Sequence, residues 1–252
     1  MPTPKRFSKG VTNVASDKTM GNLIVPDPTS VVTYMEDFFK FDPGEWITTR
    51  VATPTAYNTA GGHVEGYEQI TDATDGVLAV VTTAGDDDYC FFQYGGADYD
   101  SSSDGPRETF TMIVGNKLWF KARLKCNDVD AADFYVGLFV TDTSPVASAP
   151  SDGLWFISDD GDAYLDAHLY SSSASQLSRT AIQSVSDDTY FTVGAYWDGV
   201  NTVQIFSNDI KRAEGTGITP TTTQLAVSFG IQNGSAAAST LSLDYLCVIR
   251  ER

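Results

Sequence analysis

The sequence contains few of the residues from which metal centres, disulfide scaffolds and nucleophilic triads are built. Its three cysteines are Cys90, Cys126 and Cys247, with no CxxC pair, and its two histidines are His63 and His168. An odd number of scattered cysteines predicts buried thiols, and the spacing of metal ligands is absent. Phosphate-binding loops, dinucleotide fingerprints and a Gly-x-Ser-x-Gly elbow are missing as well. We therefore expect no metal and no cofactor.

The sequence also lacks long apolar stretches. No run approaches 18 apolar residues, so we expect no membrane-spanning helix. The basic N-terminus is not followed by the apolar segment of a signal peptide. We expect a protein that is made in a cytoplasm and does not associate with membranes.

Glutamate is scarce relative to aspartate. The chain has seven Glu and 26 Asp, and its formal net charge is −17. Aspartate favours turns whereas glutamate favours helix interiors, so the chain should have many turns and few helices. The negative charge disfavours contact with nucleic-acid phosphates, and we predict no nucleic-acid partner.

Strand patterns recur along the chain from residue 31 onward. Residues 118–125 alternate apolar and polar side chains, which predicts a strand with one buried and one wet face. Residues 134–140 are apolar on both faces and predict a central strand. Asp198-Gly199 between two apolar runs predicts a hairpin turn. We predict an all-β fold, in which residues 31–252 form a single two-sheet antiparallel jelly-roll sandwich of the lectin/glucanase-like kind.

Residues 1–30 differ from this body and show neither helical nor strand periodicity. The first twenty residues carry four basic side chains and one Asp, a net charge of +3, so the other 232 residues carry −20. We predict an extended basic N-terminal arm that binds another subunit. The residues expected to make this contact are Lys5, Arg6, Phe7, Lys9, Leu23 and Ile24.

Residues 72–104 hold eight Asp and no Lys or Arg. Such charge runs are usually solvated loops, and this is one interpretation. The other is a docking surface for a basic neighbour, for example the arm of another copy. Its residues would be Asp86, Asp87, Asp88, Asp98, Asp100 and Asp104.

Motifs for the hydrolysis of glycosidic bonds are absent. Retaining glycosidases need two carboxylates close together, and none of the seven glutamates lies in a Glu-x-Asp-x-Glu pattern. His168 lies in the alternating segment 164–170, where we expect an exposed strand residue and not a general base. We predict no catalytic residues and no enzymatic activity, and a pair of aspartates that acts as a glycosidase site is the alternative.

An acidic segment, Asp159-Asp160-Gly161-Asp162, lies between two expected strands. Calcium loops require alternating oxygen ligands and a bidentate Glu, and this segment has neither. A tight turn at Asp-Gly is the favoured interpretation, and calcium binding stays an alternative.

Several segments of the chain resemble a family of tailed-bacteriophage virion proteins. They comprise residues 6–15, 21–23, 26–29, 117–123, 187–190, 229–234, 244–245 and 251–252. The resemblance implies a concanavalin A-like or laminin-G-like sandwich with no catalytic residues. It also implies a capsid cement or decoration protein, which binds the outer face of the major capsid shell and bridges capsomers to stabilise the head.

The partners implied by this resemblance are the major capsid protein and other copies of the chain, located on the capsid exterior of the virion. A homotrimer would suit local three-fold positions. The alternative is a carbohydrate-binding, lectin-like virion protein of the head surface or tail, used in host adhesion. The sequence specifies no glycan contact, because Trp119, Trp155 and Trp197 lie in apolar strands, where core positions are expected.

Overall fold

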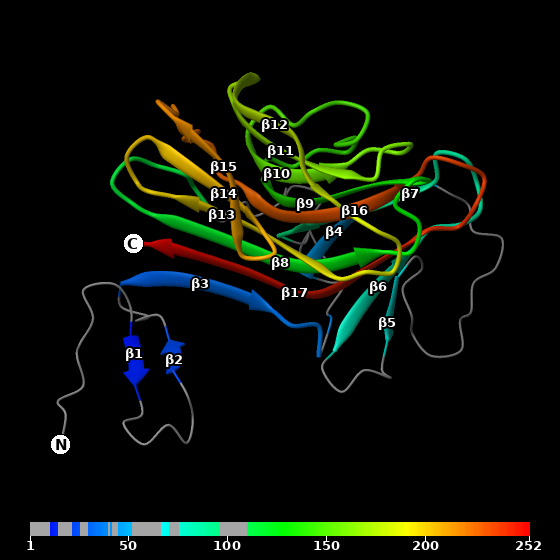
Figure 1. The fold of residues 1–252 in the computed structure, drawn as a ribbon, viewed down its shortest axis with the longest axis horizontal. Coiled ribbons are helices and arrows are strands. Elements are labelled where there is room, and N and C mark those ends of the chain that lie inside the picture. Colours follow the sequence, from blue (N-terminus) through cyan, green and yellow to red (C-terminus); the bar gives the residue numbers. More distant parts are fainter. Residues whose placement is uncertain are drawn as a thin grey trace, which may run out of the picture.

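The computed structural model describes residues 11–14, 22–25, 30–39, 41, 45–51, 67–70, 76–95 and 110–252. These residues form seventeen strands and no α-helix. Most of the strands belong to two antiparallel sheets that stack face to face (Figure 1). The predicted all-β, two-sheet jelly-roll sandwich is therefore confirmed. No helix among the described residues is long and apolar enough to cross a membrane.

The first sheet has seven strands, and its spatial order differs from the order in the sequence. The order is β12 (Ala174–Ser184), β11 (Tyr164–Ser171), β10 (Gly153–Ser158), β9 (Ala132–Phe139), β16 (Ala226–Asn233), β7 (Tyr89–Tyr94) and β4 (Trp46–Val51). Strand β16, from near the C-terminus, thus separates β7 from β9. This crossover brings residues from distant parts of the sequence onto one face.

The second sheet has eight strands. The order is β15 (Ile210–Thr216), β14 (Thr202–Ser207), β13 (Phe191–Trp197), β8 (Leu118–Cys126), β17 (Thr240–Glu251), β6 (Val77–Val81) and β5 (Tyr67–Ile70), with β3 (Val31–Glu36) also paired to β17. In β8, Leu118, Phe120, Ala122 and Leu124 are buried, and the side chains between them face outward. The predicted alternation in this strand is confirmed.

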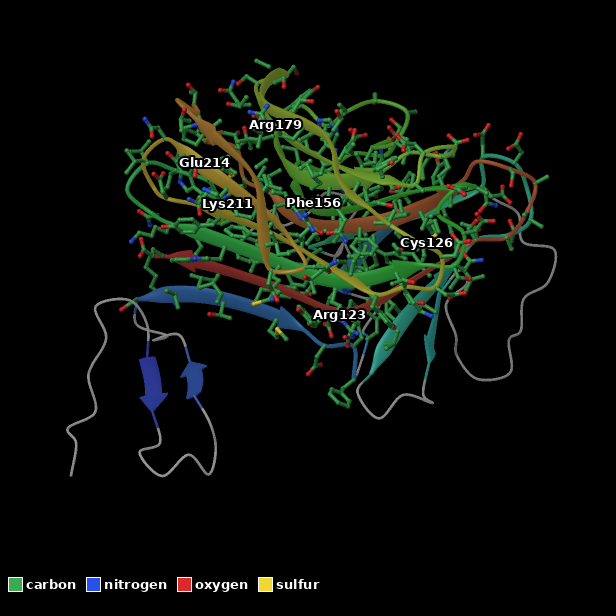
Figure 2. All side chains as sticks on the ribbon, viewed as in Figure 1. Arg123, Cys126, Phe156, Arg179, Lys211 and Glu214 are labelled. Atoms are coloured by element: carbon green, nitrogen blue, oxygen red, sulfur yellow. The ribbon has the colours of Figure 1, made fainter. Side chains whose placement is uncertain are left out.

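The main core lies between the two sheets. Its side chains come from the inward positions of both sheets, and Phe156 of β10, labelled in Figure 2, is one of them. Phe120 of β8 stacks on Phe156 with ring centroids 6.3 Å apart. Strand β9 is buried on both faces, as predicted. Its residues Phe134, Val136 and Leu138 enter this core, whereas Tyr135 and Phe139 belong to a second cluster on the outer face of the seven-stranded sheet.

The hairpin turn predicted at Asp198-Gly199 is confirmed. Gly199 has a φ of +77°, a conformation that favours glycine. The Asp198 carboxylate accepts hydrogen bonds from the N–H groups of Val200, Asn201 and Thr202 at 2.8–3.0 Å. These three bonds hold the connection between β13 and β14.

Within residues 1–30 the structure contains two short strands, β1 (Val11–Val14) and β2 (Asn22–Val25), which pair antiparallel with each other. The sequence shows no strand periodicity here, so these two strands were not identified from it. Four residues are too few for alternation to stand out in a sequence, and the pairing depends on a partner eight or more positions away. Leu23 and Ile24 lie in β2, and Lys5, Arg6, Phe7 and Lys9 lie outside the described residues.

Candidate functional site

A continuous row of rings crosses the outer face of the seven-stranded sheet. Successive centroids along this row are between 4.4 and 6.1 Å apart. The rings come from β7, β9, β10 and β11, and we call the row the aromatic strip. Its members are Tyr89, Phe91, Tyr135, Phe139, Trp155, His168 and Tyr170.

Three glycines make room for these rings. A Cβ atom on Gly137 would lie 2.6 Å from Cβ of Trp155, and one on Gly230 would lie 2.5 Å from Cδ1 of Phe91. A Cβ on Gly153 would overlap Cβ of Phe139. Glycine inside a strand often marks such a close approach. These glycines were the feature of the sequence from which the strip could have been suspected.

The rings in the middle of the strip are buried, and those on β11 are more exposed to solvent. Phe91, Tyr135, Phe139 and Trp155 are all buried, with at most 3% of each exposed. His168 and Tyr170 are half-buried. Tyr164, which precedes them on the same face of β11, is 46% exposed. The end of the strip on β11 is therefore the part that a ligand can reach.

Two buried polar atoms of the strip have no hydrogen-bond partner. They are Oη of Tyr135 and Nδ1 of His168. Buried polar atoms are nearly always paired, so each unpaired one calls for an explanation such as a bound water or ligand. His168 lies in strand β11 between aromatic residues, as predicted, but it is half-buried and not exposed, because Trp155 and Tyr170 pack against its ring. His63 lies outside the described residues.

Carboxylates surround the open end of the strip. Asp166 lies two residues before His168 on β11, and its carboxylate accepts a hydrogen bond from the Ala181 N–H at 2.8 Å. Burial lowers the pKa of His168, although Asp166 and Asp159 oppose this shift. The imidazole is therefore neutral at pH 7 and can both donate and accept one hydrogen bond. Partial burial and the charge of Asp166 raise the pKa of Asp159.

Asp133 of β9 lies at the same end of the sheet. Burial raises the pKa of its carboxyl from 3.8 to about 6, even though the Asp160 N–H donates a hydrogen bond to it at 2.7 Å. Several groups with perturbed pKa values thus gather here. Such gatherings are common at functional sites and support this end of the strip as the candidate.

The predicted tight turn at Asp159–Asp162 is present. Gly161 has a φ of +75°, and the Asp162 N–H donates to the Asp159 carbonyl at 3.2 Å. A further bond from the Gly161 N–H to the Asp130 carbonyl (2.8 Å) fixes the turn to a neighbouring loop. Within the described ranges, no group of three or more His, Cys, Asp or Glu side chains is arranged to hold a metal ion.

The acidic residues predicted as a docking surface are only partly described. Asp86 and Asp87 are exposed on the turn between β6 and β7, whereas Asp88 is half-buried and bonds the Thr83 hydroxyl and the Gly85 N–H. Asp88 therefore stabilises its own turn. Asp98, Asp100 and Asp104 lie outside the described residues.

Asn233 fastens this acidic turn to the body. The sequence Asn233-Gly234 predicts only a turn, but Asn233 ends β16 and is fully buried. Its side-chain amide donates to the carbonyls of Thr83 and Gly85 at 2.6 and 2.9 Å. The position of the turn next to the seven-stranded sheet depends on these bonds.

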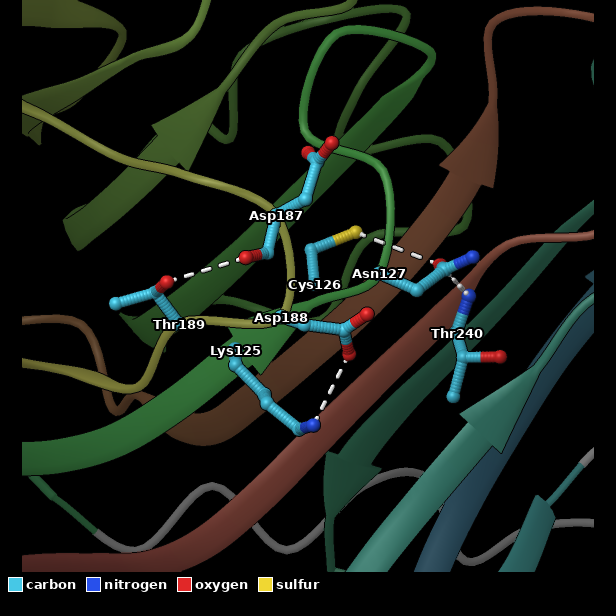
Figure 3. Close-up of polar contacts among 7 residues, drawn as sticks. All are labelled: Lys125, Cys126, Asn127, Asp187, Asp188, Thr189 and Thr240. Carbon is cyan, nitrogen blue, oxygen red and sulfur yellow. Dashed lines mark hydrogen bonds and ion pairs between the residues drawn. The ribbon is translucent and has the colours of Figure 1, made fainter.

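The outer face of the eight-stranded sheet has a different character. Its basic side chains are paired with acids: Lys117 with Glu251, Lys121 with Asp209, Arg123 with Asp244, and Lys125 with Asp188. Figure 3 shows the last of these pairs, 3.0 Å long, beside the buried thiol of Cys126. Trp119 is 36% exposed on this face, so its predicted core position is wrong. It occupies an outward position of the alternating strand β8 and packs on Tyr196.

All three cysteines are free thiols, as predicted. Cys90 and Cys126 are buried and Cys247 is half-buried. Burial raises the pKa of Cys90 and of Cys126 to about 12. They are thus unreactive packing residues.

Comparison with solved structures places the fold among concanavalin A-like jelly rolls. The Emp47p carbohydrate recognition domain is 10% identical, with a TM-score of 0.56 over 88% of this chain and 97% of that one. A β-glucanase from Bacillus licheniformis is 12% identical, with a TM-score of 0.56 over 87% and 97%. A protein of unknown function from Shewanella oneidensis MR-1 is 12% identical, with a TM-score of 0.53 over 88% and 87%.

No protein-family model matches the chain, and no curated protein is similar to it in sequence. At these low identities the structural likeness shows the fold alone. The fold is shared by carbohydrate recognition domains and by glucanases, so it does not by itself decide between binding and catalysis.

Proposed function

We propose that the protein is a carbohydrate-binding module that holds a sugar at the open end of the aromatic strip. The observation that carries this proposal is the buried, unpaired Nδ1 of His168 beside the half-buried ring of Tyr170. A pyranose has an apolar face of C–H groups and an edge of hydroxyl groups. The ring of Tyr170 suits the apolar face, and His168 and Asp166 suit the hydroxyls.

The fold supports this reading, since the Emp47p domain with the same architecture is a carbohydrate recognition domain. Binding sites of this kind combine a mostly apolar surface with a few polar groups that fix orientation. The strip has that composition. Seven rings lie in contact, and Asp166 lies on β11 between Tyr164 and His168.

We expect binding without hydrolysis. The glutamate pattern of glucanases is absent from the sequence, and the Asp166 carboxylate already accepts a backbone hydrogen bond. Incubation with β-glucans should release no reducing ends. Sustained release that is lost in Asp166→Asn would instead establish a glycosidase with an aspartate pair.

A glycan array followed by calorimetric titration tests the binding proposal. The variants His168→Ala and Tyr170→Ala should each weaken binding to any sugar that the wild type captures by about tenfold or more. Trp119→Ala is the matched control, because it removes an exposed ring from the opposite outer face. Circular dichroism should show that all three variants remain folded. The proposal fails if the array is silent, or if only Trp119→Ala reduces binding.

A virion role is a second proposal, supported by the resemblance of several segments to phage virion proteins and by the charge difference between residues 1–20 and the rest of the chain. In this role the basic arm would bind the major capsid protein or another copy of the chain. Removal of residues 1–25 should leave the sandwich folded and abolish attachment to heads. Full occupancy of heads by the truncated protein would refute the arm, and light scattering would test the trimer.

A further inference from the structure

The two outer faces of the sandwich differ in the charge that they offer to a ligand. Strands β7, β9, β10, β11 and β16, which make up the middle of the seven-stranded sheet, contain no Lys or Arg. By contrast, β8 of the other sheet alone carries three basic residues, Lys121, Arg123 and Lys125. The aromatic strip therefore lies on strands that carry no Lys or Arg.

The edge strands of this sheet, β12 and β4, carry basic residues, but these residues lie away from the aromatic strip. Arg179 of β12 donates to the carbonyls of Ser178 (2.8 Å) and of Glu214 (3.4 Å), and Glu214 belongs to β15 of the other sheet. The guanidinium is thus directed to the side of the sandwich where β12 contacts β15. Figure 2 labels Arg179 and Glu214. Arg50 of β4 lies at the opposite edge of the sheet from β11.

The carboxylates at the open end of the strip are uncompensated. In the described part of the chain, neither Asp159 nor Asp166 forms an ion pair. They lie close enough to each other and to His168 for their charges to interact. A ligand that brings positive charge to this place would relieve the repulsion between them, whereas a ligand with carboxylates would increase it.

We infer that the glycan held at the open end of the aromatic strip carries free, protonated amino groups, as in polymers of glucosamine. This inference rests on the proposed function and specifies its substrate class. The amino group would lie beside Asp159 and Asp166, and the sugar ring on Tyr170 and His168. Because Nδ1 of His168 is buried without a partner, a hydroxyl group of the same sugar has a polar atom to meet at this end of the strip. Polyuronates are the class that this site excludes.

The test compares three oligosaccharides of equal length by calorimetric titration at about pH 6, where an amine is protonated. They are a glucosamine hexamer, its fully N-acetylated counterpart and a hexamer of uronic acids. N-acetylation removes the charge and keeps the ring. We expect the glucosamine hexamer to bind about fivefold or more tightly than the N-acetylated one, and the uronate not to bind. Raising the salt from about 0.05 to about 0.5 M should reduce this preference, because charges near the surface are screened.

The double variant Asp159→Asn/Asp166→Asn should remove the preference, so that this variant binds the glucosamine hexamer no more tightly than it binds the N-acetylated hexamer. Asparagine keeps an oxygen that can accept the Ala181 N–H, so the fold should persist. Asp209→Asn is the matched control, because it removes an exposed carboxylate from the opposite face.

Failure of this inference differs from failure of the proposed function. If the N-acetylated hexamer or the uronate binds as tightly as the glucosamine hexamer, or the double variant keeps the preference, the amino-sugar inference is overturned while carbohydrate binding stands. If no glycan of any class binds, both are overturned.

Discussion

Replacing Gly137 by alanine should destabilise the protein through its effect on the aromatic strip. Gly137 lies in β9 directly opposite Trp155 of β10. A Cβ atom at this position would lie 2.6 Å from both Cα and Cβ of Trp155 and would overlap the Leu154 carbonyl oxygen. Two of these atoms belong to the backbone of a central strand, so rotation of a side chain cannot relieve the overlap.

The expected loss follows from the cost of overpacking. An extra methyl group in a well-packed region costs about 1–3 kcal/mol. Because β9 and β10 must separate to accommodate the methyl group added by Gly137→Ala, we expect the free energy of unfolding to fall by the upper value of this range, about 3 kcal/mol. In a chain of this size each kcal/mol lowers the melting temperature by about 2–4 °C, so the loss should be about 6–12 °C. Glycan binding should weaken as well, since Trp155 supports His168.

Gly194→Ala is the matched control. Gly194 also lies within a strand, β13, but a Cβ there would approach only the Phe120 carbonyl oxygen (3.3 Å) and Cβ of Phe206 (3.8 Å). Replacing a glycine reduces the conformational entropy of the unfolded chain, which can even stabilise a protein. The free energy of unfolding of Gly194→Ala should therefore stay within about 1 kcal/mol of the wild-type value. Scanning calorimetry on both variants measures the difference. Equal melting temperatures would refute the argument that Gly137 is required by the close approach of Trp155.

Three further predictions concern other parts of the fold. Burial raises the pKa of Asp133 from 3.8 to about 6, so the contribution of this carboxyl to the free energy of unfolding is full below pH 3.8 and is lost as the pH rises through 6. Asp133→Asn should therefore raise the free energy of unfolding by about 1 kcal/mol at about pH 8 and leave it unchanged at about pH 4. Melting curves that differ equally from those of the wild type at both pH values would contradict this. Asp198→Ala should cost about 1 kcal/mol at neutral pH, because three backbone N–H groups of the turn lose their acceptor, and urea denaturation of Asp198→Asn should show a smaller loss. Asn233→Ala should cost about 2 kcal/mol, because the carbonyls of Thr83 and Gly85 lose their side-chain donor. Hydrogen exchange should rise first in the turn 83–88, and unchanged exchange there would show that the turn is held by other contacts.

Local patterns were enough to predict the elements of the sandwich. Alternation in residues 118–125 follows from the two-residue period of a strand, and the structure buries Leu118, Phe120 and Leu124 accordingly. Asp198-Gly199 predicts its turn because glycine alone adopts a positive φ without strain and the aspartate can bond the following N–H groups. These features depend only on neighbours in the chain, and so they can be predicted from it.

The candidate site could not be predicted in the same way. The segment containing Tyr164, Asp166, His168 and Tyr170 shows that these residues share one face of a strand, but not what covers that face. The contacts of Asn233 could not be predicted from the sequence either. Its neighbour Gly234 predicts a turn, yet burial of the amide depends on two carbonyls about 150 positions earlier in the chain.

The sequence by itself determined that this protein is an acidic all-β sandwich with free thiols, because composition, alternation and turn residues act over a few neighbouring positions. Only the tertiary structure decided which aromatic residues form one strip, and that the strands beneath this strip are ones without Lys or Arg. Phe91 and Tyr135 come into contact because β16, formed by residues 226–233, is inserted between their strands and supplies Gly230 where Phe91 needs space. Strand order and register are set by the packing of the whole chain. A shift of the register by one residue would turn these side chains to the other face of the sheet.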